Sequence, residues 1–194
     1  MNGNNLPVGE AFPWALPRYD WPHDRARRMA QRLAGAPSVT LADAMSVQND
    51  IRSLAAERNV RSLLRCADSL AGGLPPRVRE ALDTLRSWDF RATRDRVAPT
   101  LYRAWFGAFQ RRSGLEGLPG LTLAALDGEA PELAERPAVA ACSALVMALD
   151  TLEARLGPGL ARWTYARAHR ARFRHALSAL DPRDRWEPPL LPED

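Results

Sequence analysis

The apolar residues of this chain recur mostly at intervals of three and four positions, and this spacing strongly limits what the chain can fold into. Such intervals bring side chains to one face of an α-helix, whereas a half-buried strand needs strict alternation. No alternating run and no internal repeat is found. Prolines and glycines divide the pattern into segments of helical length. The sequence therefore predicts an all-α fold with six or seven helices and irregular ends.

Capping residues and helix breakers set the expected boundaries. We expect Asp24 to cap a first helix that Gly35 ends, and Thr40 to form a capping box with Asp43 at the start of the second. Residues 114–136 are rich in glycine and proline, and we expect them to be irregular. The helices are expected at 24–34, 41–54, 60–70, 76–88, 97–113, 137–156 and 160–181, with 137–156, the most apolar, at the centre of the core.

The length of 194 residues suits one domain. Residues 1–23 contain four prolines with aromatic residues between them, which favours an ordered loop laid over a surface. Residues 24–181 carry the helices. Residues 182–194 hold four more prolines and no period, which is typical of an extended tail.

The basic charge does not by itself indicate nucleic-acid binding. The net charge is +4 and there is no lysine, so all 27 basic residues are arginines. The 23 acids are interleaved with them and leave helix faces of mixed sign, without a single basic stripe. We also find no signal peptide and no uninterrupted apolar run near the length of a membrane span, so neither a nucleic acid nor a membrane is an expected partner.

The residues that could carry chemistry do not form a familiar motif. His169 and His175 are six positions apart, whereas metal pairs on a helix use three or four, so no metal site is predicted. Cys66 and Cys142 lie in apolar helical patterns, and we expect buried thiols in preference to a disulfide. No G-x-S-x-G motif and no glycine-rich phosphate loop is present, and no cofactor is expected.

Five sequence blocks, taken in order, resemble the second part of the β subunit of the penicillin acylases (penicillin amidases). The blocks are NGNNLPVG, DWPHDRARRM, TLADAMSVQNDIRSL, ALDTLRSWDFRATRD with LYRAWFGAF, and ARWTYARAHRARFRHAL. SVQNDIRSL and LRSWD are the most specific. The resemblance runs from Asn4 to about Leu177. It implies that the chain is the helical segment of a larger α/β N-terminal-nucleophile (Ntn) hydrolase, truncated at one or both ends.

The resemblance also implies a reaction, the hydrolysis of N-acyl amide bonds such as those of β-lactams or acyl-homoserine lactones, which is chemistry of antibiotic metabolism. In this family an amino-terminal serine attacks the amide and its own α-amino group acts as the base. Asn4 matches the asparagine that donates a hydrogen bond to the oxyanion, although turn propensity alone would make it a loop residue. Arg25 matches an arginine that lies near the nucleophile and helps to orient the asparagine and the substrate; its alternative is a solvated first-turn residue.

The chain departs from the family pattern in three places. No SNNW-like serine start is present, so the nucleophile is expected from the remainder of the same precursor, namely the nucleophile-bearing segment and the α subunit. The family calcium uses an acid between the asparagine and the arginine, but the nearest positions here are Trp14, Ala15 and Leu16, and no calcium ligand is identified. The chain ends at PED, where family members continue into β structure.

Two functions of different classes remain open. In the first, this helical segment contributes Asn4 and Arg25 to an amide-cleaving acylase, which the resemblance would place in the bacterial periplasm or among secreted proteins. In the second, it is a stand-alone, non-catalytic helical interaction module. Helical bundles commonly present binding surfaces, so the second reading is the one that the fold class by itself favours.

Overall fold

The structure is a computed structural model that describes residues 23–35, 37–70, 73–117, 119–127 and 137–170. The proline-rich segment 1–22, with Asn4, and the tail 182–194 lie outside these residues. The described chain is helical and contains no strand, which confirms the all-α prediction. Its elements are α1 (Asp24–Leu33), α2 (Leu41–Gln48), α3 (Leu54–Asp68), α4 (Pro76–Arg86), α5 (Ala98–Ser113), α6 (Pro119–Asp127), α7 (Pro137–Leu156), a 3₁₀ turn (Leu160–Arg162) and α8 (Tyr165–Ala168).

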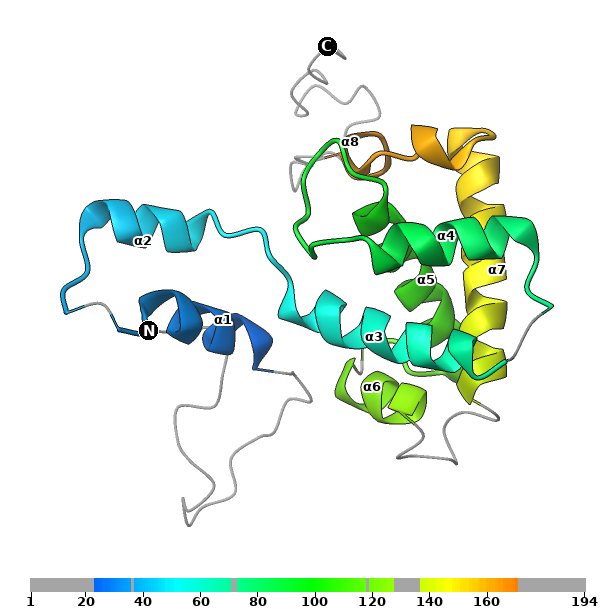
Figure 1. The fold of residues 1–194 in the computed structure, drawn as a ribbon, viewed down its shortest axis with the longest axis horizontal. Helices are drawn as coiled ribbons and strands as arrows, with labels where there is room; N and C mark the ends of the chain where they lie inside the picture. The colour runs from blue at the N-terminus through cyan, green and yellow to red at the C-terminus, as the bar shows by residue number, and fades with distance from the viewer. Residues whose placement is uncertain (1–22, 36, 71–72, 118, 128–136, 171–194) are drawn as a thin grey trace, which may run out of the picture.

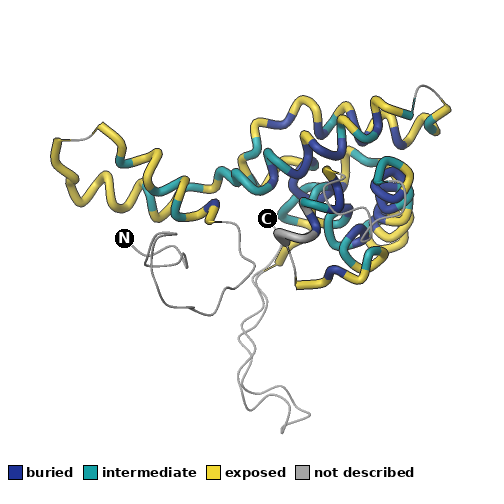
Figure 2. The backbone as a smooth tube through the Cα atoms, turned by 90° about the horizontal axis from the view of Figure 1, so that it is seen from below, coloured by how far each residue is buried: buried dark blue, intermediate teal, exposed yellow. Residues whose placement is uncertain are grey.

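The helices form a packed body from which α1 and α2 extend to one side (Figure 1). The helix α3 runs from this arm into the body, where α7 packs most extensively against α5 and α3. Figure 2 shows that the buried backbone positions concentrate in the body, whereas α2 has no buried residue. The core therefore forms around α3, α4, α5 and α7.

The most apolar helix takes the central place expected for it. Leu145, Leu149 and Leu152 of α7 are buried, and Trp105 of α5 donates its indole N–H to the carbonyl of Ala141 at 3.0 Å. By length and composition α7 is also the one helix among the described residues that could cross a membrane. Its long buried face against α3 and α5 is what the central helix of a folded core presents.

Two local predictions are confirmed. Thr40 and Asp43 form the reciprocal capping box at the start of α2, with the Thr40 hydroxyl accepting from the Asp43 N–H at 3.2 Å. Cys66 and Cys142 are free thiols, half-buried and buried. Burial raises the pKa of both thiols, that of Cys142 to about 11.

The prediction that Asp24 caps the first helix is wrong. His23 occupies the cap position without a side-chain bond, and Asp24 is the first helical residue. Its carboxylate is buried and accepts two hydrogen bonds from Arg58, at 2.7 and 2.8 Å. The Asp24 carboxylate oxygens therefore bind Arg58 of α3 and not the N–H groups at the start of α1.

The expected helix over 41–54 ends earlier, at Gln48, and α3 begins at Leu54 instead of about Val60. The backbone between the two helices is used in tertiary hydrogen bonds: the Ser53 N–H donates to the Phe90 carbonyl at 3.0 Å, and the Ile51 carbonyl accepts from Ala92 at 3.1 Å. These bonds form a short antiparallel bridge that a continuous helix could not make.

The segment 114–136 was expected to be irregular, but it contains α6. Pro119 suits the first position of a helix, where its missing N–H costs nothing. Ala125 and Leu126 are buried, and α6 packs against α3 and α7. Tertiary burial therefore stabilises a helix that glycine and proline content argued against. Residues 128–136 lie outside the described part of the chain.

A single helix over 160–181 is also wrong as far as the chain is described, to residue 170. The structure has a 3₁₀ turn and then the one-turn helix α8. The N–H groups of Tyr165 and Ala166 donate to the carbonyls of Arg96 and Arg94, at 2.8 and 2.9 Å. These donors are tied to the loop before α5, so the backbone cannot continue one helix through them.

Candidate functional site

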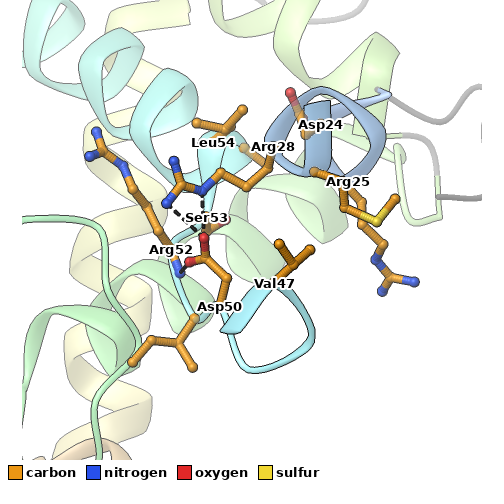
Figure 3. A pocket seen from close by; sticks show the side chains of 11 residues that line it. Asp24, Arg25, Arg28, Val47, Asp50, Arg52, Ser53 and Leu54 are labelled. Atoms are coloured by element: carbon orange, nitrogen blue, oxygen red, sulfur yellow. Dashed lines mark hydrogen bonds and ion pairs between the residues drawn. The ribbon is translucent and has the colours of Figure 1, made fainter. Parts of the chain in front are cut away.

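Of the two residues predicted for the site, the structure describes one. Asn4 lies outside the described residues, so its role stays a prediction. Arg25 is exposed in the first turn of α1 and lines a pocket of ≈ 390 Å³ between α1 and the segment that joins α2 to α3 (Figure 3). The other lining residues are Asp24, Arg28, Met29, Val47, Asp50, Ile51, Arg52, Ser53, Leu54 and Ala55.

An ion pair attaches α1 to α3 at one side of this pocket. Arg58 of α3 binds the Asp24 carboxylate through both terminal nitrogens, and this hydrogen bonding is the main cause that raises the pKa of Arg58. The two-point geometry fixes orientation as well as distance. Arg25 follows Asp24 in the chain, so the anchor also sets where the backbone of Arg25 lies.

A second cluster attaches α1 to the segment after α2. Asp50 accepts from Arg28 at 2.8 Å and from the Arg52 N–H at 2.9 Å, and Arg32 lies 3.8 Å from the same carboxylate. Burial would raise the pKa of Asp50, but the hydrogen bonds from Arg52 and Arg28, with the charges of Arg28 and Arg32, hold it below the ordinary value. Asp50 is therefore a charged anchor at the centre of the pocket wall.

The backbone of this wall is held from the opposite side by the loop after α4. Trp88 donates its indole N–H to the carbonyl of Arg91 at 2.9 Å, and its ring lies 5.2 Å from that of Phe90. Phe90 has φ = 62°, a conformation that costs free energy in a residue with a side chain. Its carbonyl accepts from Ser53. The SVQNDIRSL and ALDTLRSWDFRATRD blocks, which are far apart in sequence, are thus joined next to the pocket, through Phe90 and Ala92.

The described residues of the pocket supply charge and walls but no attacking group. The Ser53 hydroxyl accepts from the Ala56 N–H at 3.1 Å and serves as the cap of α3. No histidine lines the pocket, and the part of the chain that the structure describes has no group of three or more residues suited to hold a metal ion. In Figure 3 the Arg25 guanidinium points away from Asp50, outside the cluster that Arg28 makes with it.

Sequence reasoning missed the Asp24–Arg58 and Asp50–Arg28 pairs. Asp50 lies inside the SVQNDIRSL block that carries the resemblance, which was a signal for its importance. Its partner could not be read from the sequence, because several arginines lie within the first helix.

Comparison with protein families decides the relationship. A family model described as penicillin amidase matches residues 1–190. The chain belongs to the penicillin amidase family. A comparison with individually curated proteins gave no match.

Membership in the penicillin amidase family relates the chain to amidohydrolases. The match covers residues 1–190 of the 194 and includes all of the described helices. The pocket at α1 therefore lies within the part of the chain that the family model matches, and Arg25, the residue that the sequence blocks predicted for the site, lines it.

Proposed function

We propose that this chain is the helical segment of a penicillin amidase-like enzyme that cleaves N-acyl amide bonds, such as those of β-lactams or acyl-homoserine lactones. The observation that carries the proposal is the family match over residues 1–190. A serine with a free α-amino group, supplied by a polypeptide segment outside these 194 residues, would attack the amide carbonyl.

In this proposal Asn4 donates its side-chain N–H to the oxyanion that forms when the serine oxygen adds to the carbonyl. Such a donor acts chiefly in the transition state, because charge develops on the oxygen only there. The family pattern of the NGNN stretch supports this role. For this role, the Asn4 side chain would have to lie within hydrogen-bond distance of the substrate oxygen that the nucleophilic serine attacks.

Arg25 is proposed to position the asparagine and the substrate from α1. The support is the attachment of α1: the Asp24–Arg58 and Asp50–Arg28 pairs hold the helix at two points, close to Arg25 in sequence. A positioning residue must be held on a rigid element to be effective. The remainder of the precursor is the expected partner at this face.

The test uses the full-length precursor and a chromogenic N-acyl substrate. Asn4→Ala should lower kcat by roughly 10²–10³ through the loss of one oxyanion donor, and Asn4→Asp should be no better, because it sets a carboxylate against an anion. Arg25→Ala should lower the rate less. Arg27→Ala is the matched control, because the Arg27 side chain is 63% exposed, does not line the pocket and reaches Asp24 only at 3.9 Å, whereas Arg58 holds that carboxylate at 2.7 Å.

Three results would contradict the proposal: full activity of Asn4→Ala, an equal loss in the Arg27→Ala control, or release of product by the 194-residue chain alone. Circular dichroism of each variant should show unchanged helix content. A loss of rate then reports on the site and not on folding.

One observation favours the second function, a non-catalytic interaction module. The helix α2 leaves Leu41 and Met45 78% and 55% exposed. An apolar face of this kind suits a partner helix or sheet. The activity assay separates the two functions, since a binding module would release no product in any context.

A further inference from the structure

A second pocket, of ≈ 290 Å³, lies where α5, α7 and α8 meet. Three arginines line it: Arg103 and Arg111 from α5, and Arg155 from α7. Among the described residues no acidic side chain lines it, and it shares no lining residue with the pocket at α1. Within this part of the chain, positive charge therefore gathers at the pocket without a lining carboxylate to oppose it.

The arginines of this pocket differ from most of the others on the described helices. Arg58 and Arg77 bind Asp24 and Asp150, each at 2.7 Å, whereas the structure records no ion pair of Arg103, Arg111 or Arg155 within the described residues. Arg111 and Arg155 lie in the last turns of their helices, where the helix dipole favours a cation. That reason does not apply to Arg103, which lies nearer the start of α5.

A buried hydroxyl provides an independent observation. Thr100 lines the same pocket and is only 3% exposed, yet its hydroxyl oxygen has no hydrogen-bond partner among the described residues. Leaving a buried hydroxyl unpaired costs free energy that a bound ligand could recover. The wall of the pocket thus offers a polar group that the chain itself does not use.

A stacked pair of rings from α8 and its C-terminal end also lines the pocket. Tyr165 and His169 stack with their centroids 4.9 Å apart, and the Tyr165 N–H is tied to the carbonyl of Arg96 at 2.8 Å. Ala104 and Leu152 add apolar surface. A ligand here would meet cations and hydroxyls together with a smaller apolar area.

We propose that this pocket binds a small molecule that carries a phosphate group. Guanidinium groups bind phosphate through paired hydrogen bonds. Three arginines suit the double negative charge of a phosphate better than the single charge of a carboxylate ligand. The pocket volume of ≈ 290 Å³ leaves room beyond the phosphate for an attached group. The proposal concerns binding alone and does not use the amide-cleaving chemistry proposed above.

The test is a titration of the 194-residue chain, by calorimetry at fixed ionic strength, with inorganic phosphate, glycerol phosphate and acetate. We expect saturable binding of one phosphate or glycerol phosphate per chain, and much weaker binding of acetate. Tighter binding of glycerol phosphate would identify a phosphate monoester as the ligand class, and equal binding would identify free phosphate.

Substitutions locate the site. Arg103→Gln should weaken binding about tenfold or more, since a hydrogen bond to a charged group is lost. Arg112→Gln is the matched control, because Arg112 is an exposed arginine of the same helix that does not line the pocket, and it should change the affinity less than twofold. Thr100→Val should weaken binding while leaving the melting temperature of the free protein unchanged or higher, because the hydroxyl it removes has no partner in the chain.

The proposal is overturned by an absence of saturable binding, by equal affinity for acetate, or by equal losses in Arg103→Gln and Arg112→Gln. Equal losses of affinity would mean that phosphate binding depends only on the net positive charge of the chain and not on this pocket. A Thr100→Val variant that binds as tightly as the original chain would remove the buried hydroxyl from the site.

Discussion

At the scale of single residues, the acids near the start of the described chain act as tertiary anchors. Asp24 binds Arg58 from the next-but-one helix, and Asp50 binds Arg28 across the arm. The carboxylates are largely buried, with exposed side-chain fractions of 12% and 6%. A charge so removed from water persists only because donors surround it, and breaking its pair is costly for the same reason.

Asp50→Asn should change the pH dependence of stability. The folded pKa of Asp50 is lowered, so the charged form contributes stability above the ordinary aspartate pKa of about 3.9, and this contribution is lost as the pH falls through the lower folded value. We expect the substitution to cost about 1.5 kcal/mol or more at pH 7, and the cost to shrink as the pH falls below about 5 and through the lowered folded pKa of Asp50. Urea unfolding measured across this range checks both.

The control for this substitution is Asp83→Asn. Asp83 also pairs with an arginine, Arg86 at 2.9 Å, but its side chain is 72% exposed. Exposed pairs contribute little, so its cost should stay below about 1 kcal/mol. A cost of Asp50→Asn that does not change with pH would show that the Asp50 charge is not what anchors α1.

At the scale of elements, the ends of the helices follow backbone requirements. The helix α5 ends at Gly114, which has φ = 66° and allows the Leu115 N–H to donate to the Gln110 carbonyl at 2.8 Å. Glycine adopts this left-handed conformation without the penalty that other residues incur. Gly107, in contrast, lies inside α5, where glycine is a poor helix former.

The two glycines of α5 should respond to alanine in opposite directions. Gly114→Ala should destabilise the protein by about 1 kcal/mol, because a side chain is forced into the left-handed conformation. Gly107→Ala should stabilise it by up to ~1 kcal/mol, since the nearest atom to the new methyl group, 3.3 Å away, is the mobile end of Arg111. Urea denaturation of both variants tests the pair. Shifts of the same sign would refute this account of how α5 ends.

At the scale of the whole molecule, stability is concentrated in the body formed by α3 to α7. The arm of α1 and α2 is attached mainly through ion pairs and the short bridge at residues 51–53 (Figure 1). In the body, α7 has one face in the core and another toward solvent: Leu145 is fully buried, whereas Met147 is 48% exposed. Substitutions two positions apart on this helix should therefore differ widely in effect.

Leu145→Ala should destabilise the protein by about 2–5 kcal/mol, because it removes buried methyl groups and leaves a cavity. Met147→Ala should stay within roughly 0.5 kcal/mol, as expected for a surface position. Thermal and urea unfolding of both variants provide the measurement. A large cost for Met147→Ala would mean that another part of the chain covers the outer face of α7.

Local rules were sufficient for many features of the chain. Helical spacing predicted the all-α class, the Thr40–Asp43 pair predicted the start of α2, and apolar surroundings predicted free cysteines. The ordered blocks indicated the penicillin amidase family, which the match over residues 1–190 shows. These properties depend on neighbours within a few positions in the chain, or on the order of blocks along it, and a linear sequence contains both.

Features that depend on distant partners were decided only by the tertiary structure. The end of α2 and the start of α3 depend on hydrogen bonds to the loop at Phe90. The helix α8 starts afresh at Tyr165 because its first donors bind the loop at Arg94 and Arg96, and α6 is stabilised by the burial of Ala125 and Leu126. The same holds for the choice of Arg58 and Arg28 as partners of Asp24 and Asp50. The free energy of such contacts arises when the chain folds and brings the partners together, so no local propensity contains it.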